Sequence, residues 1–377
     1  MSVPTISLRS VRTAARIGRT RAGGAFTALA TLGALLVTGT VAVSAADPAW
    51  SVVTSTSSAT LNGVSCVSSS YCLAVGTYGS EKWNGSTTAT VAVPSSTGQT
   101  ATSLNGISCS STTFCISVGR YFKGGEDVGL LDRWNGTKWA LGTYVLGPDA
   151  TLDLNSVSCK GTTFCMAVGF YTDEPTYPFS LMWNGSSWTS ETVPSPSSTD
   201  DMTLNGVSCT SSSFCLAVGT VGDDQLMVKW NGSSWTLLDT TPNLFPAAIR
   251  CRSTSFCMAV GSASTAAMAE QWNGSTWSVV SAPNGGGTSY NNLTGVSCTG
   301  TTFCAAVGTA TFSASESTFS DVWNGATWSA APTVNPVTPS DWFNGISCTT
   351  ATGGEFCLGV GATVNGSDVT HSLVEKY

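Results

Sequence analysis

Histidine and charged side chains are scarce in this chain of 377 residues, which contains one histidine, His371, and only 10% charged residues. A single histidine argues against a Ser-His-Asp triad and against a histidine-based metal site, so any general base would have to be a carboxylate. The chain also lacks a phosphate-binding loop motif. We therefore expect no catalytic triad, no metal and no cofactor. Glycine, serine and threonine are abundant instead, and the apolar residues show no helical spacing.

Long apolar runs are absent except at the N-terminus. Five arginines lie between positions 9 and 21, an apolar run follows, and small residues precede Asp47. This order predicts an export signal over residues 1–46 and a secreted, extracellular domain over residues 47–377. The alternative is an uncleaved membrane tether, because residues 23–46 are long enough to span a bilayer.

Positive charge is also scarce once the predicted signal is removed. Residues 47–377 keep ten basic and 22 acidic side chains, a net charge of −12. Such a surface repels phosphate backbones and anionic lipids. We expect no nucleic-acid partner, no membrane contact beyond the export signal, and a monomer.

The fourteen cysteines form seven regularly spaced pairs. An even number of cysteines in an exported chain predicts disulfides, and the usual C-x5-C spacing with one histidine is poor for zinc. The predicted bonds join neighbours in the sequence: Cys66–Cys72, Cys109–Cys115, Cys159–Cys165, Cys209–Cys215, Cys251–Cys257, Cys298–Cys304 and Cys348–Cys357.

The cysteine pairs mark a repeat with a mean length of 47 residues, so seven copies account for nearly all of residues 47–377. In the fourth copy, short strands are predicted at Leu204–Cys209, Phe214–Gly219, Gln225–Trp230 and Trp235–Leu238, with an Asn-Gly turn before the last. Four strands per repeat of this length are typical of a propeller blade. The sequence predicts an all-β, seven-bladed β-propeller with four-stranded antiparallel blades and one hairpin disulfide per blade.

The two ends of the domain complement each other. The last repeat stops at Tyr377, where the first repeat has Trp83, and so lacks a fourth strand. Residues 49–53 resemble the fourth strand at 276–280. We expect the N-terminal strand to complete the last blade and cover its open edge.

Binding residues are predicted on the connections between second and third strands and between repeats, because these vary whereas the disulfide and Asn-Gly connections do not. The variable connections are rich in carboxylates and aromatic rings, which suit a neutral carbohydrate or a cation. The candidate ligand-binding residues are Arg120, Tyr121, Asp127, Tyr171, Asp173, Glu174, Asp223, Asp224, Trp342 and His371.

The fifth repeat departs from the others, because Arg250 and Arg252 flank its first cysteine near the expected channel. They could contact an anion or pair with a neighbouring acid, and the ion pair is the favoured interpretation.

The motif Ser-Cys-x4-Phe-Cys-x-Ala-Val-Gly resembles repeats of secreted bacterial seven-bladed propellers of the sialidase-like, BNR-repeat kind, over the whole of residues 47–377. The ends of two hairpins, at Gly274–Trp277 and Gly325–Trp328, are similar to the sialidase Asp-box, but Trp272 and Trp323 replace its aspartate. The arginine triad that the resemblance would require is not supplied, so sialidase activity is not expected.

Fold alone does not choose a function. We predict a secreted, non-catalytic binding module for a glycan or a cell-surface protein. The alternatives are a glycoside hydrolase or lyase that uses two loop carboxylates, such as Asp127 and Asp173, and a purely structural envelope protein.

Overall fold

A computed structural model of the chain describes residues 50–55, 57–77, 79–94, 100–144, 151–238, 243–335, 340–367 and 369–377. The chain divides into two units, Met1–Ala45 and Ala46–Tyr377. The described residues all belong to the second unit, and the predicted export signal lies outside them.

The regular elements in these ranges are strands that form six sheets. Four sheets have four strands each: β2 (Leu61–Ser68), β3 (Tyr71–Gly76), β4 (Gly79–Trp83) and β5 (Thr88–Val91); β11 (Thr151–Cys159), β12 (Cys165–Thr172), β13 (Thr176–Trp183) and β14 (Trp188–Glu191); β15 (Met202–Ser211), β16 (Phe214–Val221), β17 (Asp224–Trp230) and β18 (Trp235–Leu237); β19 (Phe245–Ser253), β20 (Phe256–Ala263), β21 (Ala266–Trp272) and β22 (Trp277–Val280).

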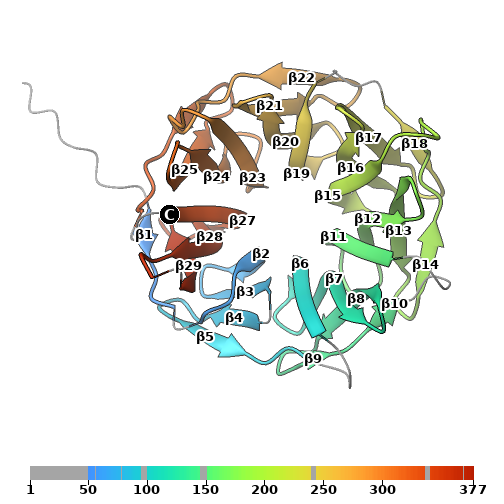
Figure 1. Cartoon of the computed structure of the whole chain (residues 1–377), viewed down its shortest axis with the longest axis horizontal. Coiled ribbons are helices and arrows are strands. Elements are labelled where there is room, and N and C mark those ends of the chain that lie inside the picture. The colour runs from blue at the N-terminus through green and yellow to red at the C-terminus, as the bar shows by residue number, and fades with distance from the viewer. Residues whose placement is uncertain are drawn as a thin grey trace, which may run out of the picture. The chain divides into compact units, whose positions relative to one another are not determined.

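The other two sheets are larger. One has five strands: β6 (Thr100–Ser111), β7 (Phe114–Lys123), β8 (Glu126–Trp134), β9 (Trp139–Ala140) and β10 (Thr143–Tyr144). The last has eight strands: β23 (Tyr290–Cys298), β24 (Cys304–Thr311), β25 (Glu316–Trp323), β26 (Trp328–Ala330), β27 (Ser340–Ala351), β28 (Gly354–Val364), β29 (Thr370–Lys376) and β1 (Ser51–Val52). In Figure 1 the sheets follow one another around a central opening, with the first strand of each repeat nearest the middle.

The all-β propeller prediction is confirmed, but the prediction of seven separate four-stranded blades was wrong. Strand pairing gives five sheets of four or five strands and one larger sheet. The larger sheet arises because the long strand β27 begins at Ser340, which pairs in parallel with Glu316 of β25. The five-stranded sheet arises because two short strands, β9 and β10, both pair with β8.

The N-terminal strand pairs with the last strand, as expected. Ser51 lies opposite Lys376 and Val52 opposite Glu375 in an antiparallel register. Trp50, which precedes β1, is 1% exposed, and its indole N–H donates to the Ser320 hydroxyl at 2.7 Å. The two ends of the second unit therefore close one sheet together.

The seven predicted disulfides are confirmed, and they engage all fourteen cysteines. Each bond joins cysteines that lie directly opposite each other on the first two strands of a repeat, such as Cys209 and Cys215. Closing so short a loop stabilises the fold by about 2 kcal/mol in the loop-entropy model. The bonds stabilise hairpins that are otherwise rich in small polar residues.

Tryptophans connect consecutive repeats through hydrogen bonds as well as packing. The indole N–H of Trp139 donates to Ser80 at 3.1 Å, and that of Trp235 donates to Ser180 at 3.0 Å. Each serine hydroxyl in turn donates to a backbone carbonyl of its own sheet. Trp328 has no such acceptor, because the equivalent position in the preceding repeat is Ala269, and its buried indole nitrogen has no hydrogen-bond partner in the described part of the chain.

Ala269→Ser should raise the free energy of unfolding by about 1 kcal/mol, because the new hydroxyl can accept from Trp328 and donate to the Val280 carbonyl across the strand pair. Chemical denaturation under non-reducing conditions measures this gain. The gain should disappear in a Trp328→Phe background, which lacks the indole N–H. An equal gain in both backgrounds would contradict the proposed hydrogen bond.

Candidate functional site

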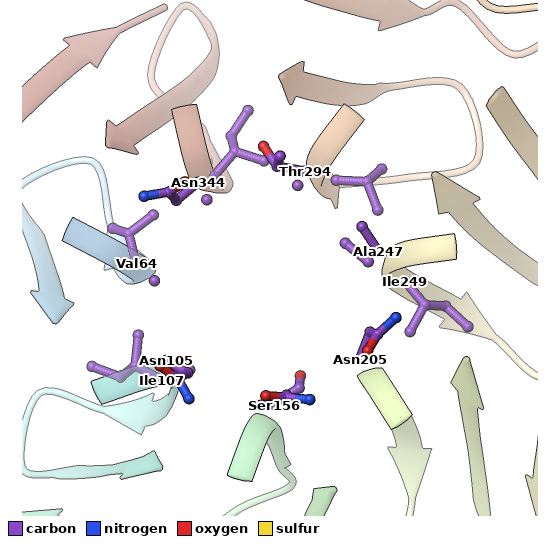
Figure 2. Close-up of a pocket in the computed structure, with 18 of the residues that line it drawn as sticks. Val64, Asn105, Ile107, Ser156, Asn205, Ala247, Ile249, Thr294 and Asn344 are labelled. Atoms are coloured by element: carbon purple, nitrogen blue, oxygen red, sulfur yellow. The ribbon is translucent and has the colours of Figure 1, made fainter. Parts of the chain in front are cut away.

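A central channel is formed by the first strands of all seven repeats. Its chamber at the variable-loop end has a volume of about 240 Å³ and is lined by neutral residues. Figure 2 shows side chains from these strands around the chamber, including Asn105, Asn205, Thr294 and Asn344. We call this space the loop-side chamber.

The asparagines of the loop-side chamber join neighbouring repeats. A side chain of one repeat donates to a backbone carbonyl of the next at 2.7–3.1 Å at six junctions, through Asn62, Asn105, Asn155, Asn205, Thr294 and Asn344. The fifth repeat has Ala247 at this position and makes no such bond. These side chains already donate hydrogen bonds between repeats, which reduces their capacity to bind a ligand.

A second chamber lies at the disulfide end of the channel. Seven residues line both spaces, namely Ser156 and the six β-branched residues Val64, Ile107, Val157, Ile249, Val296 and Ile346. The second space, about 230 Å³ in volume, is called the disulfide-side chamber.

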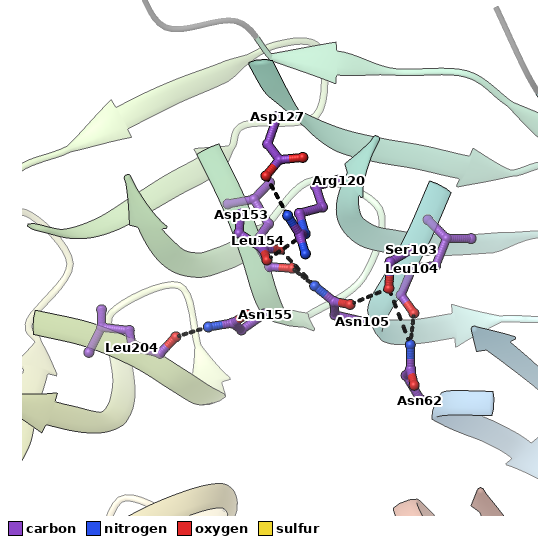
Figure 3. A network of polar contacts seen from close by, with 10 residues as sticks. All are labelled: Asn62, Ser103, Leu104, Asn105, Arg120, Asp127, Asp153, Leu154, Asn155 and Leu204. Atoms are coloured by element: carbon purple, nitrogen blue, oxygen red, sulfur yellow. Dashed lines mark hydrogen bonds and ion pairs between the residues drawn. The ribbon is translucent and has the colours of Figure 1, made fainter. Parts of the chain in front are cut away.

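The most connected polar group lies beside the loop-side chamber and centres on Arg120. Its guanidinium bonds to Asp127 on the neighbouring strand β8, and its Nε lies 2.9 Å from Asp153 of the next repeat. Asp153 also accepts from the Asn105 amide at 2.8 Å. Figure 3 shows the network continuing through Ser103 to the first repeat.

Asp153 has the most perturbed acidity in this network. Burial raises the pKa of its carboxyl to about 6, with Arg120 acting to lower the pKa, Asp127 to raise it and the Asn105 hydrogen bond to lower it. The Arg120 side chain is 42% exposed, so the network is open to a ligand on one side. A carboxyl group that titrates near pH 6 can donate or accept a proton under mildly acidic conditions.

The predicted aromatic residues have different surroundings. Tyr121 is 5% exposed and packs in the core between the first two repeats, where a ligand cannot reach its ring. Tyr171 is half-buried and stacks on Tyr177, with ring centroids 5.4 Å apart. Burial, then Asp173 and then Tyr177 raise the pKa of Tyr171.

The remaining predicted residues are spread over several sheets. Asp173 and Glu174 are exposed on the connection that follows Tyr171. In the next repeat, Asp223 is exposed on the equivalent connection and Asp224 is exposed at the start of β17. Trp342, half-buried on β27, and His371, exposed on β29, belong to the eight-stranded sheet. The structure joins Arg120 to Asp127 and places Tyr171 and Asp173 on the adjacent repeat, but Trp342 and His371 belong to neither of these two sheets.

Asp153 was missed by the sequence analysis, although a signal was present. Thr151, Asp153 and Asn155 alternate with leucines at the start of β11, and alternate residues of a strand share a face. Asp153 therefore shares a face with Asn155, which lines the channel.

No protein-family model and no curated protein sequence matches the chain. Solved structures do resemble it. "YCF48 bound to D1 peptide" matches with a TM-score of 0.56 at 13% identity, over 88% of this chain and 96% of that one. The "WD40 beta propeller domain of Doa1" matches with a TM-score of 0.58 at 10% identity, over 87% and 97%.

A third similar structure is the "GH74 xyloglucanase from Xanthomonas campestris", with a TM-score of 0.55 at 11% identity. That match covers 86% of this chain and 55% of the xyloglucanase. These likenesses establish the fold alone, and the protein is a β-propeller.

Seven disulfides indicate an oxidising environment. Among the residues given above, no helix is long and apolar enough to cross a bilayer. Within the same residues, no three His, Cys, Asp or Glu side chains are grouped so that they could hold a metal ion.

Proposed function

We propose that the protein is a secreted, non-catalytic binding module that recognises a neutral carbohydrate at the variable-loop end of the channel. The observation that carries this proposal is the stacked Tyr171–Tyr177 pair next to the exposed carboxylates of Asp173 and Glu174. Aromatic faces can pack on the apolar face of a sugar ring, and carboxylates accept hydrogen bonds from its hydroxyls. The Arg120–Asp153 pair, which links two repeats beside this surface, would hold the platform in a fixed geometry.

The compared structures support binding in a general way. One of them was determined with a bound peptide and another is a xyloglucanase. A cell-surface protein is therefore the alternative partner for the same loops. We also propose that the protein is secreted and that it is a monomer.

A glycan array followed by calorimetry on residues 47–377 tests the carbohydrate proposal. Asp173→Asn combined with Glu174→Gln should weaken binding of the best glycan at least tenfold, because both carboxylate acceptors lose their charge at nearly constant shape. Tyr171→Phe should retain binding, whereas Tyr171→Ala should lose it. Glu355→Gln, near the start of β28 at the opposite strand ends, is the matched control and should bind normally.

Circular dichroism and thermal unfolding show whether each variant is folded, so that loss of binding contacts can be distinguished from misfolding. A folded double variant that binds as tightly as the parent would contradict the assigned surface. The absence of any glycan ligand, together with capture of a peptide or protein that competes for the same residues, would replace carbohydrate by a protein partner.

The pKa of Asp153 favours a second candidate function, an extracellular glycoside hydrolase. A carboxyl with a pKa near 6 can act as a general acid, and Asp127 shares the same guanidinium. The test is hydrolysis of chromogenic glycosides at pH 5–6. If the protein hydrolyses a glycoside and Asp153→Asn abolishes this activity, the protein is an enzyme and the non-catalytic proposal is wrong. Binding of a glycan without hydrolysis would exclude hydrolase activity on that glycan.

A further inference from the structure

Serine hydroxyls line the disulfide-side chamber in six of the seven repeats. Each hydroxyl accepts a hydrogen bond from the backbone N–H of the first cysteine in the next repeat, at 2.8–3.0 Å. The serines are Ser65, Ser108, Ser158, Ser208, Ser297 and Ser347. No described residue accepts from these hydroxyls, so their hydrogens remain available to donate to an occupant of the chamber.

The fifth repeat places Arg250 at the serine position. Arg250 lines the chamber, and its Nε is buried without a hydrogen-bond partner among the described residues. The favoured interpretation of an ion pair was therefore wrong, because the ion pairs found in these ranges both belong to Arg120. A buried donor without a partner is costly to a fold, so water or a ligand in the chamber must accept from the Arg250 Nε.

Further positive charge surrounds Arg250. Lys160 lines the same chamber from the third repeat, and Arg252 lies two residues away on β19. Burial, then the charge of Arg252, lowers the pKa of Arg250 to about 10, so the guanidinium stays charged at neutral pH. Burial, then Arg250 and Arg252, lowers the pKa of Lys160. Two of the ten basic residues of an otherwise acidic domain therefore line one cavity, and Arg252 outside its lining repels both of them.

We propose that the disulfide-side chamber binds a tetrahedral oxyanion of the phosphate or sulfate class. Its lining offers hydrogen-bond donors from serine, arginine and lysine, and a doubly charged anion would offset the repulsion among the three cations. This site is separate from the proposed carbohydrate surface, and it can hold either a free ion or the terminal group of a phosphate or sulfate ester.

Calorimetry and thermal unfolding with inorganic phosphate, and in parallel with sulfate, test this site. We expect saturable binding at one site and a melting temperature that rises with anion concentration. Arg250→Ser restores the residue of the other repeats, and should weaken phosphate binding at least tenfold. The same variant should unfold no earlier than the parent in anion-free buffer, because serine removes an unpartnered cation and can accept from the Cys298 N–H.

Arg133→Ser is the matched control, because it removes the same charge from an exposed position on β8 and should leave phosphate binding unchanged. If both variants weakened phosphate binding equally, the effect would come from the lower net charge of the protein, and the proposed site would be wrong. Destabilisation of Arg250→Ser in anion-free buffer, with phosphate binding intact, would assign Arg250 a structural role instead. If O-phosphoserine bound as tightly as inorganic phosphate, the natural ligand would be the terminal group of an ester. If O-phosphoserine did not bind, the natural ligand would be the free ion.

Discussion

The free energy of unfolding should fall by roughly 9 kcal/mol between pH 5 and pH 8, because the fold buries carboxyl groups that are more stable with a proton. Burial raises the pKa of Asp132 and Asp321 to about 7 and that of Glu375 to about 8. The Gly142 N–H acts to lower the pKa of Asp132. The Val334 N–H lowers, and Asp341 raises, the pKa of Glu375.

The fall in stability with rising pH follows from the number of protons that the folded and unfolded states bind. Unfolded aspartate and glutamate lose their protons near pH 4, whereas the folded groups keep theirs to about pH 7 or 8. Between these values the folded state binds more protons, so stability is complete below the unfolded pKa and is lost as the pH rises. Chemical denaturation at four pH values, without reductant, measures the slope.

Asp321→Asn provides the control for this prediction. Both carboxylate oxygens of Asp321 are buried without a partner, and the amide stays neutral at every pH. The variant should therefore show a shallower decline and should be more stable than the parent at pH 8. A stability that is constant or rises from pH 5 to pH 8 would contradict the assigned protonation.

Trp50→Ala should reduce the free energy of unfolding by about 3–5 kcal/mol, the usual range for deleting a buried tryptophan. The Trp50 ring packs 5.8 Å from Phe343 and 5.6 Å from Tyr377, measured between ring centroids. Its loss removes the contact that holds the two-residue strand β1 against β29. Chemical denaturation and limited proteolysis near residue 50 would both report the change.

Two variants separate the packing of Trp50 from its hydrogen bond. Trp50→Phe keeps a ring but loses the bond to Ser320, and should cost about 1–2 kcal/mol. Trp342→Ala removes an equally large but half-buried side chain, and should cost clearly less than Trp50→Ala. Equal losses at positions 50 and 342 would show that closure by the N-terminal strand adds no particular stability.

The repeat could be predicted in detail because its signals are local. The cysteine spacing, the Asn-Gly turns and the alternating strands are each set by neighbours in the sequence, and the strand register follows from them. The match between the two ends also predicted the β1–β29 pairing. The division into sheets could not be predicted, because it depends on the single pair Glu316–Ser340 between strands of different repeats.

Side-chain partners were harder to predict than strands. The sequence places Arg120 and Asp127 close together, since a hairpin joins them, but Asp153 reaches them only through the packing of the next repeat. Tyr121 was assigned to a binding surface although strand alternation buries it. Arg250 was assigned an acidic partner, yet no described carboxylate reaches it.

The ring is held together unevenly around its circumference. At the junction between the fifth and sixth repeats, Ala247, Arg250 and Ala269 replace an amide and two hydroxyls that form hydrogen bonds at other junctions. The polar contacts that remain lie toward the variable-loop end, where the Ser262 and Tyr290 hydroxyls are 2.6 Å apart and Asn291 donates to the Thr265 carbonyl. Near the channel, this junction therefore lacks both hydrogen bonds that the other six junctions form between repeats. We expect the repeats on its two sides to separate before the others do as denaturant is added.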